Sequence, residues 1–137
     1  MIQDKKVIIA IPIYRDLREE EIVALDNNLE ILRNYPTALI KPTGLNTNAL
    51  KERYPQVGEI EVSNQWLGTI NGIMGYNEMM TSPDFYSLFS DYEYLLICQT
   101  DVWIFRDDLM KWIDMGIDLV GAPWPNRNMY LHFPMKQ

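Results

Sequence analysis

The chain has 137 residues, of which 47% are hydrophobic and 23% are charged, the composition of one ordinary globular domain rather than of a disordered segment. The formal net charge of −7 argues against general binding to nucleic acid or anionic membranes, because phosphate groups repel an acidic surface. Cys98 is the only cysteine, so neither an intramolecular disulfide nor a thiolate zinc cluster can form, and its apolar neighbours predict a small core residue.

The amino terminus shows no secretory signal. The apolar run 7–11 is ended by Pro12, which leaves it too short for the core of a signal peptide or for a membrane span. We therefore expect a cytoplasmic protein without a membrane span.

Strand and helix patterns alternate along the chain. The β-branched run 7–11 is typical of a strand buried on both faces, and residues 17–34 carry an apolar stripe at helical spacing. Further strands are expected at 38–40, 59–62, 95–98 and 117–120, and further helices at 48–54, 69–80, 82–89 and from Asp107 onward. Repeated β–α units of this kind predict an α/β fold with a mainly parallel sheet flanked by helices.

A polar triplet, Gln99-Thr100-Asp101, follows the apolar run 95–98. Open α/β sheets bind ligands outside the carboxyl ends of their strands. Mg²⁺ and Mn²⁺ can be bound through one or two carboxylates together with substrate phosphates, so Asp101 by itself is a candidate metal ligand. An equally strong alternative is that Asp101 caps a turn before Val102.

The loop that begins at Pro12 is a second candidate, because it follows the first predicted strand. There Tyr14 could stack on a nucleotide base, and Arg15 could pair with a phosphate. The alternative is an ordinary strand-to-helix loop with a solvated Arg15, and the residues by themselves favour this alternative.

Glycine-containing segments give weaker signals. Residues 68–72 could present backbone N–H groups to a phosphate, but they lack the spacing of the common phosphate-binding loops. Gly75-Tyr76-Asn77 offers a small residue for close packing and an amide for hydrogen bonding. Trp124 could floor a sugar site, although a wall of the core is the more ordinary interpretation.

The remaining polar candidates do not form a recognisable catalytic arrangement. Asp107 and Asp108 are more typical of a helix start than of metal ligands. His132 is the only histidine, and no nucleophile–base arrangement can be built around it. The sequence therefore leaves the catalytic residues unidentified.

Several segments together resemble a bacterial family of domains of unknown function that is related to GT-A glycosyltransferases. The similarity runs from about residue 7 to residue 124 and depends on the order of the segments rather than on any one of them. They are Ile9-Ala10-Ile11-Pro12-Ile13-Tyr14-Arg15, Gly75-Tyr76-Asn77, Asp91-Tyr92-Glu93-Tyr94-Leu95-Leu96-Ile97, Gln99-Thr100-Asp101-Val102-Trp103-Ile104-Phe105 and Gly121-Ala122-Pro123-Trp124.

The resemblance implies a Rossmann-like, nucleotide-sugar-binding half of a GT-A fold. In GT-A enzymes an Asp-x-Asp motif binds a divalent metal and the donor, and here Gln99 stands at the first acidic position and Asp101 at the second. Asp101 is then the implied ligand of Mn²⁺ or Mg²⁺, while the loss of one charge at Gln99 predicts weaker metal binding. The implied donor-binding residues are Pro12, Tyr14, Arg15, Gln99, Thr100 and Asp101, and the sugar-site candidates are Tyr76, Asn77 and Trp124.

The resemblance also leads us to expect an acceptor-binding half beyond residue 124. Residues 1–124 would then be a truncated donor-binding domain, and residues 125–137 a tail without clear assignment. Hexosyl transfer is expected only if an acceptor half completes the site. The alternative is a non-catalytic module that self-associates as a homo-oligomer or needs a partner to complete the acceptor site.

Overall fold

The structure, a computed structural model, describes residues 6–121. The chain divides into two compact units at the boundary between Arg106 and Asp107. The first unit contains the sheet and four helices, and the second contains α5 (Leu109–Asp114). The domain boundary predicted after residue 124 lies outside the described residues.

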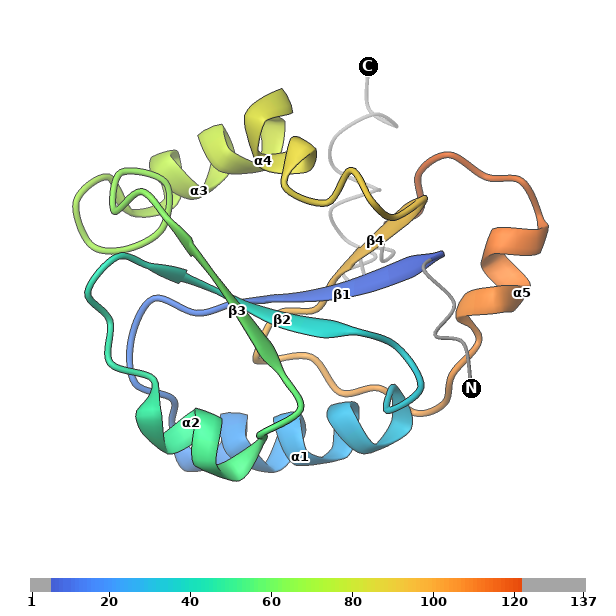
Figure 1. Cartoon of the computed structure of the whole chain (residues 1–137), viewed down its shortest axis with the longest axis horizontal. Helices are drawn as coiled ribbons and strands as arrows, with labels where there is room; N and C mark the ends of the chain where they lie inside the picture. Colours follow the sequence, from blue (N-terminus) through green and yellow to red (C-terminus); the bar gives the residue numbers. More distant parts are fainter. Residues whose placement is uncertain (1–5, 122–137) are drawn as a thin grey trace, which may run out of the picture. The chain divides into compact units, whose positions relative to one another are not determined.

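All four strands of the first unit run parallel, in the order β3-β2-β1-β4 (Figure 1). The arrangement confirms the predicted α/β class and its parallel, Rossmann-like sheet. Ala10, in the central strand β1, lies opposite Ala38 of β2 on one side and Ile97 of β4 on the other. The strands are β1 (Val7–Pro12), β2 (Thr37–Pro42), β3 (Gly58–Val62) and β4 (Tyr94–Ile97).

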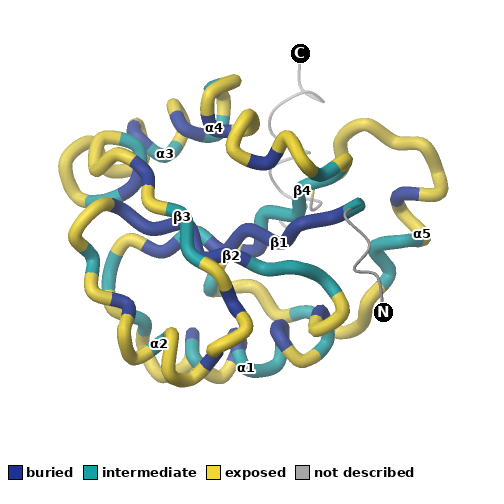
Figure 2. Tube along the Cα trace, viewed as in Figure 1, coloured by how far each residue is buried: buried dark blue, intermediate teal, exposed yellow. Residues whose placement is uncertain are grey.

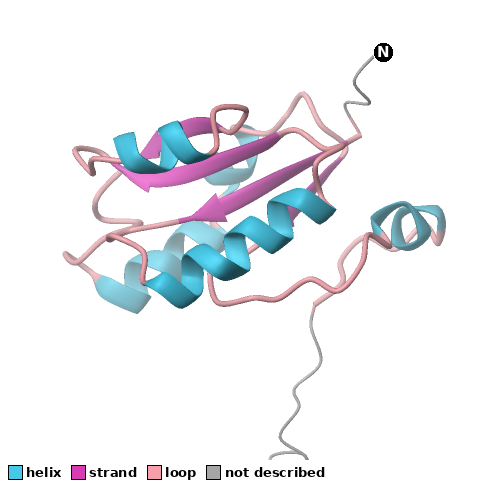
Figure 3. Cartoon of the chain, turned by 90° about the horizontal axis from the view of Figure 1, so that it is seen from below, coloured by secondary structure: helices cyan, strands magenta, loops and turns pink. Residues whose placement is uncertain are grey.

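Helices cover both faces of this sheet. Figure 1 shows one pair of helices below the sheet and another pair above it, and Figure 3 shows α1 lying over the strands on its own face. The first pair is α1 (Glu19–Ile31) and α2 (Asn48–Arg53), and the second pair is α3 (Gly72–Thr81) and α4 (Pro83–Ser87). The sheet is therefore doubly wound, with connections on both faces.

The core has two layers because the central strands are buried on both sides. Alternate residues of a strand face opposite ways. Ile8 and Ala10 of β1 pack in one cluster with Met79 of α3 and Phe85 of α4. The β1 residues between them face the other layer, which α1 covers. Every residue of β1 from Val7 to Ile11 is at most 7% exposed, as its dark colour in Figure 2 shows.

Two helices are shorter than their sequence patterns predict. The first begins at Glu19 instead of residue 17, and Arg18 is its N-cap. The helix expected over 69–80 begins only at Gly72, whose φ of +54° lies outside the right-handed helical range, so the helix does not continue back to residue 69. Within residues 6–121 no helix reaches the length and apolar character that crossing a membrane would require.

The second unit differs from the sequence prediction at two points. Its helix begins at Leu109, two residues after the expected start at Asp107, and its N-cap is Asp108 rather than Asp107, although the Asp107 carboxylate accepts the backbone N–H of Leu109 at 3.1 Å. The strand predicted at 117–120 is absent: these described residues form no ladder. A β-branched run sets only a propensity, and a strand forms only when a neighbouring strand satisfies its backbone groups.

Candidate functional site

A cavity of about 730 Å³ opens at the carboxyl ends of β1 and β4, in the size range of ligand-binding pockets. From β1 the chain passes through α1 to β2, which pairs with one side of β1. Strand β4, which follows α3 and α4 in the chain, pairs with the other side of β1. The point between β1 and β4 is thus the switch point of the sheet. Doubly wound proteins bind their ligands at this point.

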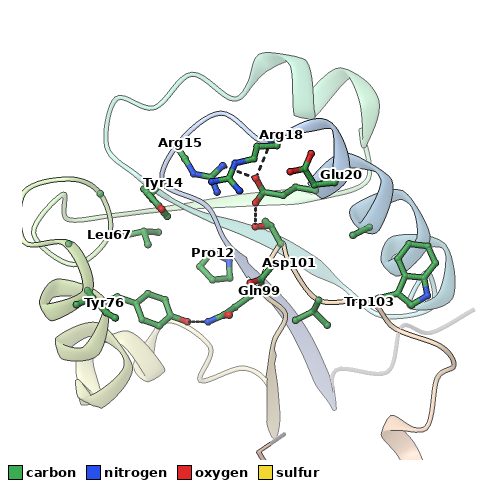
Figure 4. Close-up of a pocket in the computed structure, with 17 residues that line it drawn as sticks. Pro12, Tyr14, Arg15, Arg18, Glu20, Leu67, Tyr76, Gln99, Asp101 and Trp103 are labelled. Atoms are coloured by element: carbon green, nitrogen blue, oxygen red, sulfur yellow. Dashed lines mark hydrogen bonds and ion pairs between the residues drawn. The ribbon is translucent and has the colours of Figure 1, made fainter. Parts of the chain in front are cut away.

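Most of the predicted site residues line this cavity (Figure 4). They come from the loop after β1, from α3 and from the segment after β4. Those that line it are Pro12, Tyr14, Arg15, Tyr76, Gln99, Thr100 and Asp101. Asn77 is exposed on α3 and does not line the cavity, and Trp124 lies outside the described residues.

Glu21 is the residue at the cavity that sequence reasoning missed. It is 5% exposed, in the first turn of α1. Its Oε1 accepts Arg15 Nη1 at 2.7 Å and the backbone N–H of Arg18 at 3.1 Å, and its Oε2 accepts the Thr100 hydroxyl. Glu21 therefore ties the loop after β1 to the segment after β4.

The Glu21 carboxylate stays ionised in spite of its burial. Burial by itself raises the pKa of this carboxyl, but the hydrogen bonds from Arg15, Thr100 and the Arg18 backbone outweigh it and hold the pKa at about 2. A sequence signal for this residue did exist. Glu21 shares the buried stripe of α1 with Ala24 and Leu25, and a charged residue in such a stripe needs partners.

Arg15 is held in an ion pair, which corrects the interpretation of an ordinary loop with a freely solvated Arg15, although its side chain remains 36% exposed. Its guanidinium pairs with Glu21, and its Cζ lies 5.4 Å from the centre of the Tyr14 ring. The hydrogen bond to Glu21 is the main reason that the pKa of Arg15 is raised. The loop after β1 thus presents an ordered cation beside an aromatic ring at the cavity.

Gln99 bridges β4 to the α3 side of the cavity. Its Nε2 donates to the Tyr76 hydroxyl at 3.1 Å, a bond drawn in Figure 4. Gly75, one residue before Tyr76, lets α3 pack closely against the preceding loop, because a Cβ there would lie 2.0 Å from the backbone oxygen of Gln65. The prediction that Gly75 serves close packing is confirmed.

Asp101 is exposed and does not cap a turn. The turn that contains it is closed by the backbone, with the Val102 N–H donating to Gln99 O at 3.4 Å. In the part of the chain that the structure describes, the Asp101 carboxylate has no hydrogen-bond or ion-pair partner. Of the two roles suggested by the sequence, the capping role is therefore wrong.

The acidic groups near the cavity do not form a complete metal cage. Among residues 6–121 no three His, Cys, Asp or Glu side chains come together to hold a metal ion. Glu21 has both oxygens engaged by protein donors, which leaves Glu20 and Asp101 as the lining carboxylates with free oxygens. A divalent cation would need phosphate oxygens from a ligand to complete its shell here.

The fold and the cavity define a doubly wound α/β protein with a ligand-sized pocket at the switch point of its sheet. Residues 59–136 match the family described as "Protein of unknown function (DUF5672)", and because the match covers more than half of the chain, the chain belongs to this family. No curated protein and no solved structure matches the chain. The matched range includes the Tyr76 and Gln99–Asp101 side of the cavity but not the loop after β1.

Proposed function

We propose that the cavity binds a nucleotide-sugar donor, as in a glycosyltransferase. The observation that carries the proposal is the meeting of two loops at the switch point, one with Tyr14 and Arg15 and the other with Asp101. An aromatic face, an ordered cation and an exposed carboxylate are the groups that suit a base, a phosphate and a phosphate-bound metal.

The loop after β1 would hold the nucleotide. Tyr14 is 47% exposed and lines the cavity, so part of its ring is accessible to a base. The Arg15 Nη1 is used by Glu21 and by the backbone oxygen of Asp16, and a guanidinium has five N–H donors in all. These two hydrogen bonds fix the orientation of the Arg15 guanidinium and leave its other N–H donors available to a phosphate.

The charges around the cavity support a metal-bound diphosphate over a bare one. Two arginines, Arg15 and Arg18, face three carboxylates there, those of Glu20, Glu21 and Asp101. A diphosphate would add negative charge to a lining that is already net negative. A Mn²⁺ or Mg²⁺ ion between Asp101 and the phosphates would offset this repulsion, and it would stabilise the leaving diphosphate if transfer occurred.

Calorimetric titration with UDP and with GDP, each with and without Mn²⁺, tests the proposal. We expect metal-dependent binding by the wild type and at least about tenfold weaker binding by Asp101→Ala. Asp101 has no partner in the described chain, so its removal leaves the fold intact.

Asp91→Ala is the matched control for this titration. Asp91 is also an exposed aspartate, but it precedes β4 and so lies at the opposite end of the same strand. The control has the same change in net charge and should bind like the wild type. If the wild type binds neither nucleotide under any of these conditions, the proposal is wrong.

A second candidate function is a non-catalytic module that self-associates. It is favoured by Ile70, Ile73 and Met74, whose side chains are 64%, 77% and 77% exposed around the start of α3. Grouped exposed apolar residues mark interaction surfaces. Analytical ultracentrifugation decides this: a concentration-dependent dimer that Met74→Glu disrupts supports the module, and a monomer at all concentrations excludes it.

A further inference from the structure

Asn28 is a buried polar residue in the apolar stripe of α1. It is 1% exposed and lies between Leu25 and Leu29, which are core residues. An amide in such a position is costly unless its donors and acceptor are satisfied. The hydrogen-bond partners of Asn28 therefore indicate its structural role.

The two shortest hydrogen bonds of Asn28 go to backbone groups of the segment after β4, beside longer contacts with the side chains of Asn27 and Cys98. The Asn28 Nδ2 donates to Val102 O at 2.8 Å, and its Oδ1 accepts the Ile104 N–H at 2.8 Å. The neighbouring Asn27 donates from Nδ2 to Ile104 O at 2.8 Å. Residues 102–105 belong to no helix or strand, so these side chains supply bonds that a sheet ladder would otherwise make.

Asp101 lies between two attachment points on α1. On one side the Thr100 hydroxyl donates to Glu21, and on the other side the Val102 carbonyl accepts from Asn28. The Asp101 side chain itself has no partner among the described residues. Its position is thus set by the backbone on either side of it, and that backbone is held by α1.

We propose that Asn28 is a positioning residue that holds Asp101 in place for ligand binding. The inference rests on the proposed function, because it assigns Asn28 a part in the donor site without contact with the donor. Asn28 does not line the cavity, whereas Glu21 does and also holds Arg15. Asn28 is therefore the cleaner residue with which to test the attachment.

The main variant is Asn28→Leu, which keeps the side-chain volume and removes both backbone contacts. Two quantities are measured: the affinity for UDP and GDP with Mn²⁺, and the exchange rate of the Ile104 amide hydrogen. We expect affinity to fall about tenfold and Ile104 exchange to rise about tenfold or more. In an Asp101→Ala background, Asn28→Leu should cause no further loss of affinity, because the carboxylate it positions is gone.

Leu29→Ala is the control for simple loss of stability. Leu29 is buried on the same helix, and its truncation leaves a cavity in the core without removing a hydrogen bond to residues 102–104. It should lower the melting temperature but leave both the affinity of the folded protein and the Ile104 exchange rate relative to its neighbours unchanged. If Asn28→Leu does not fold, Asn27→Ala removes the bond to Ile104 O from a half-buried position and should give a smaller loss in the same direction.

The outcomes separate this inference from the proposed function. Wild-type binding that Asn28→Leu leaves unchanged would overturn the inference and keep the proposed function. Affinity losses that add fully in the Asn28→Leu, Asp101→Ala double variant would also overturn it. A wild type that binds neither nucleotide would overturn the proposed function, and unchanged Ile104 exchange in Asn28→Leu would then refute the attachment as well.

Discussion

Helix α1 carries two ion pairs of similar length in different surroundings, the pair at Glu21 with one contact and the pair at Asp26 with two. At its first turn Glu21 pairs with Arg15 at 2.7 Å, and further along Asp26 pairs with Arg53 at 2.6 Å. The acidic side chains are 6% and 41% exposed, respectively. The two distances are nearly the same, but one acid is buried and the other is exposed. Burial rather than distance therefore decides how much each pair contributes to stability.

The pKa values of the two acids are lowered for different reasons. In Asp26 the hydrogen bonds from Arg53 and from the Tyr54 hydroxyl bring the pKa to about 2 with little opposition. In Glu21 burial pushes the pKa upward, and the hydrogen bonds must overcome this before they lower it to about 2. The Asp26 pair fastens α1 to the end of α2, whereas the Glu21 pair organises the cavity.

The largest difference is expected on removal of each acid. Glu21→Ala leaves the Arg15 guanidinium and the Thr100 hydroxyl without their partner, and we expect the free energy of unfolding to fall by about 2–3 kcal/mol. Asp26→Ala should cost less, about 1–2 kcal/mol, because its pair with Arg53 is hydrated and the main loss is the hydrogen bond from the largely buried Tyr54 hydroxyl. Urea denaturation followed by circular dichroism measures both, and equal losses would contradict the contrast.

The second largest difference is expected in how the two acids contribute to stability at low pH. The ordinary pKa of Glu21 is 4.5 and that in the folded protein is about 2, so its contribution to stability is complete above pH 4.5 and is lost as the pH falls toward 2. Glu21→Gln should flatten the fall of the urea midpoint in this window. Asp26→Asn should flatten it less, since solvent screens the exposed site. An unchanged acid profile in Glu21→Gln would show that Glu21 is not linked to folding in this way.

The smallest expected effect is that of salt. Double-mutant cycles for Asp26–Arg53 and Glu21–Arg15, measured at low salt and at about 1 M NaCl, give the coupling in each pair. The exposed pair should lose most of its coupling at high salt, because the screening length becomes shorter than the side chains. The Glu21 pair should retain more, and equal losses in the two pairs would mean that burial does not protect it.

The sequence was sufficient for the strands and for the location of the candidate site. The strands predicted at 7–11, 38–40 and 59–62 all lie in the parallel sheet, and the one predicted at 95–98 lies in it as far as Ile97. Gln99 and Asp101 were expected at a strand end near the loop after β1, and they line the same cavity as Tyr14 and Arg15. Both successes follow from hydrophobic runs and from the rule for ligands of parallel sheets.

The failures concern contacts rather than elements, with one exception. The strand predicted at 117–120 is absent because a strand needs a partner that its own residues do not supply. Arg15 was taken as solvated because its partner, Glu21, lies on the following helix. The turn-capping role of Asp101 was undecided because nothing in the residues shows which groups close the turn.

The sequence by itself therefore determined the class of fold and the strand ends that meet at the cavity, because apolar periodicity is local and parallel strands share one carboxyl edge. Only the tertiary structure decided which polar residues hold that edge in place. Glu21 meets Thr100 across 79 positions of sequence, and Asn28 meets Ile104 across 76. Such pairings depend on how α1 packs against the end of β4, and no pattern within either segment specifies them.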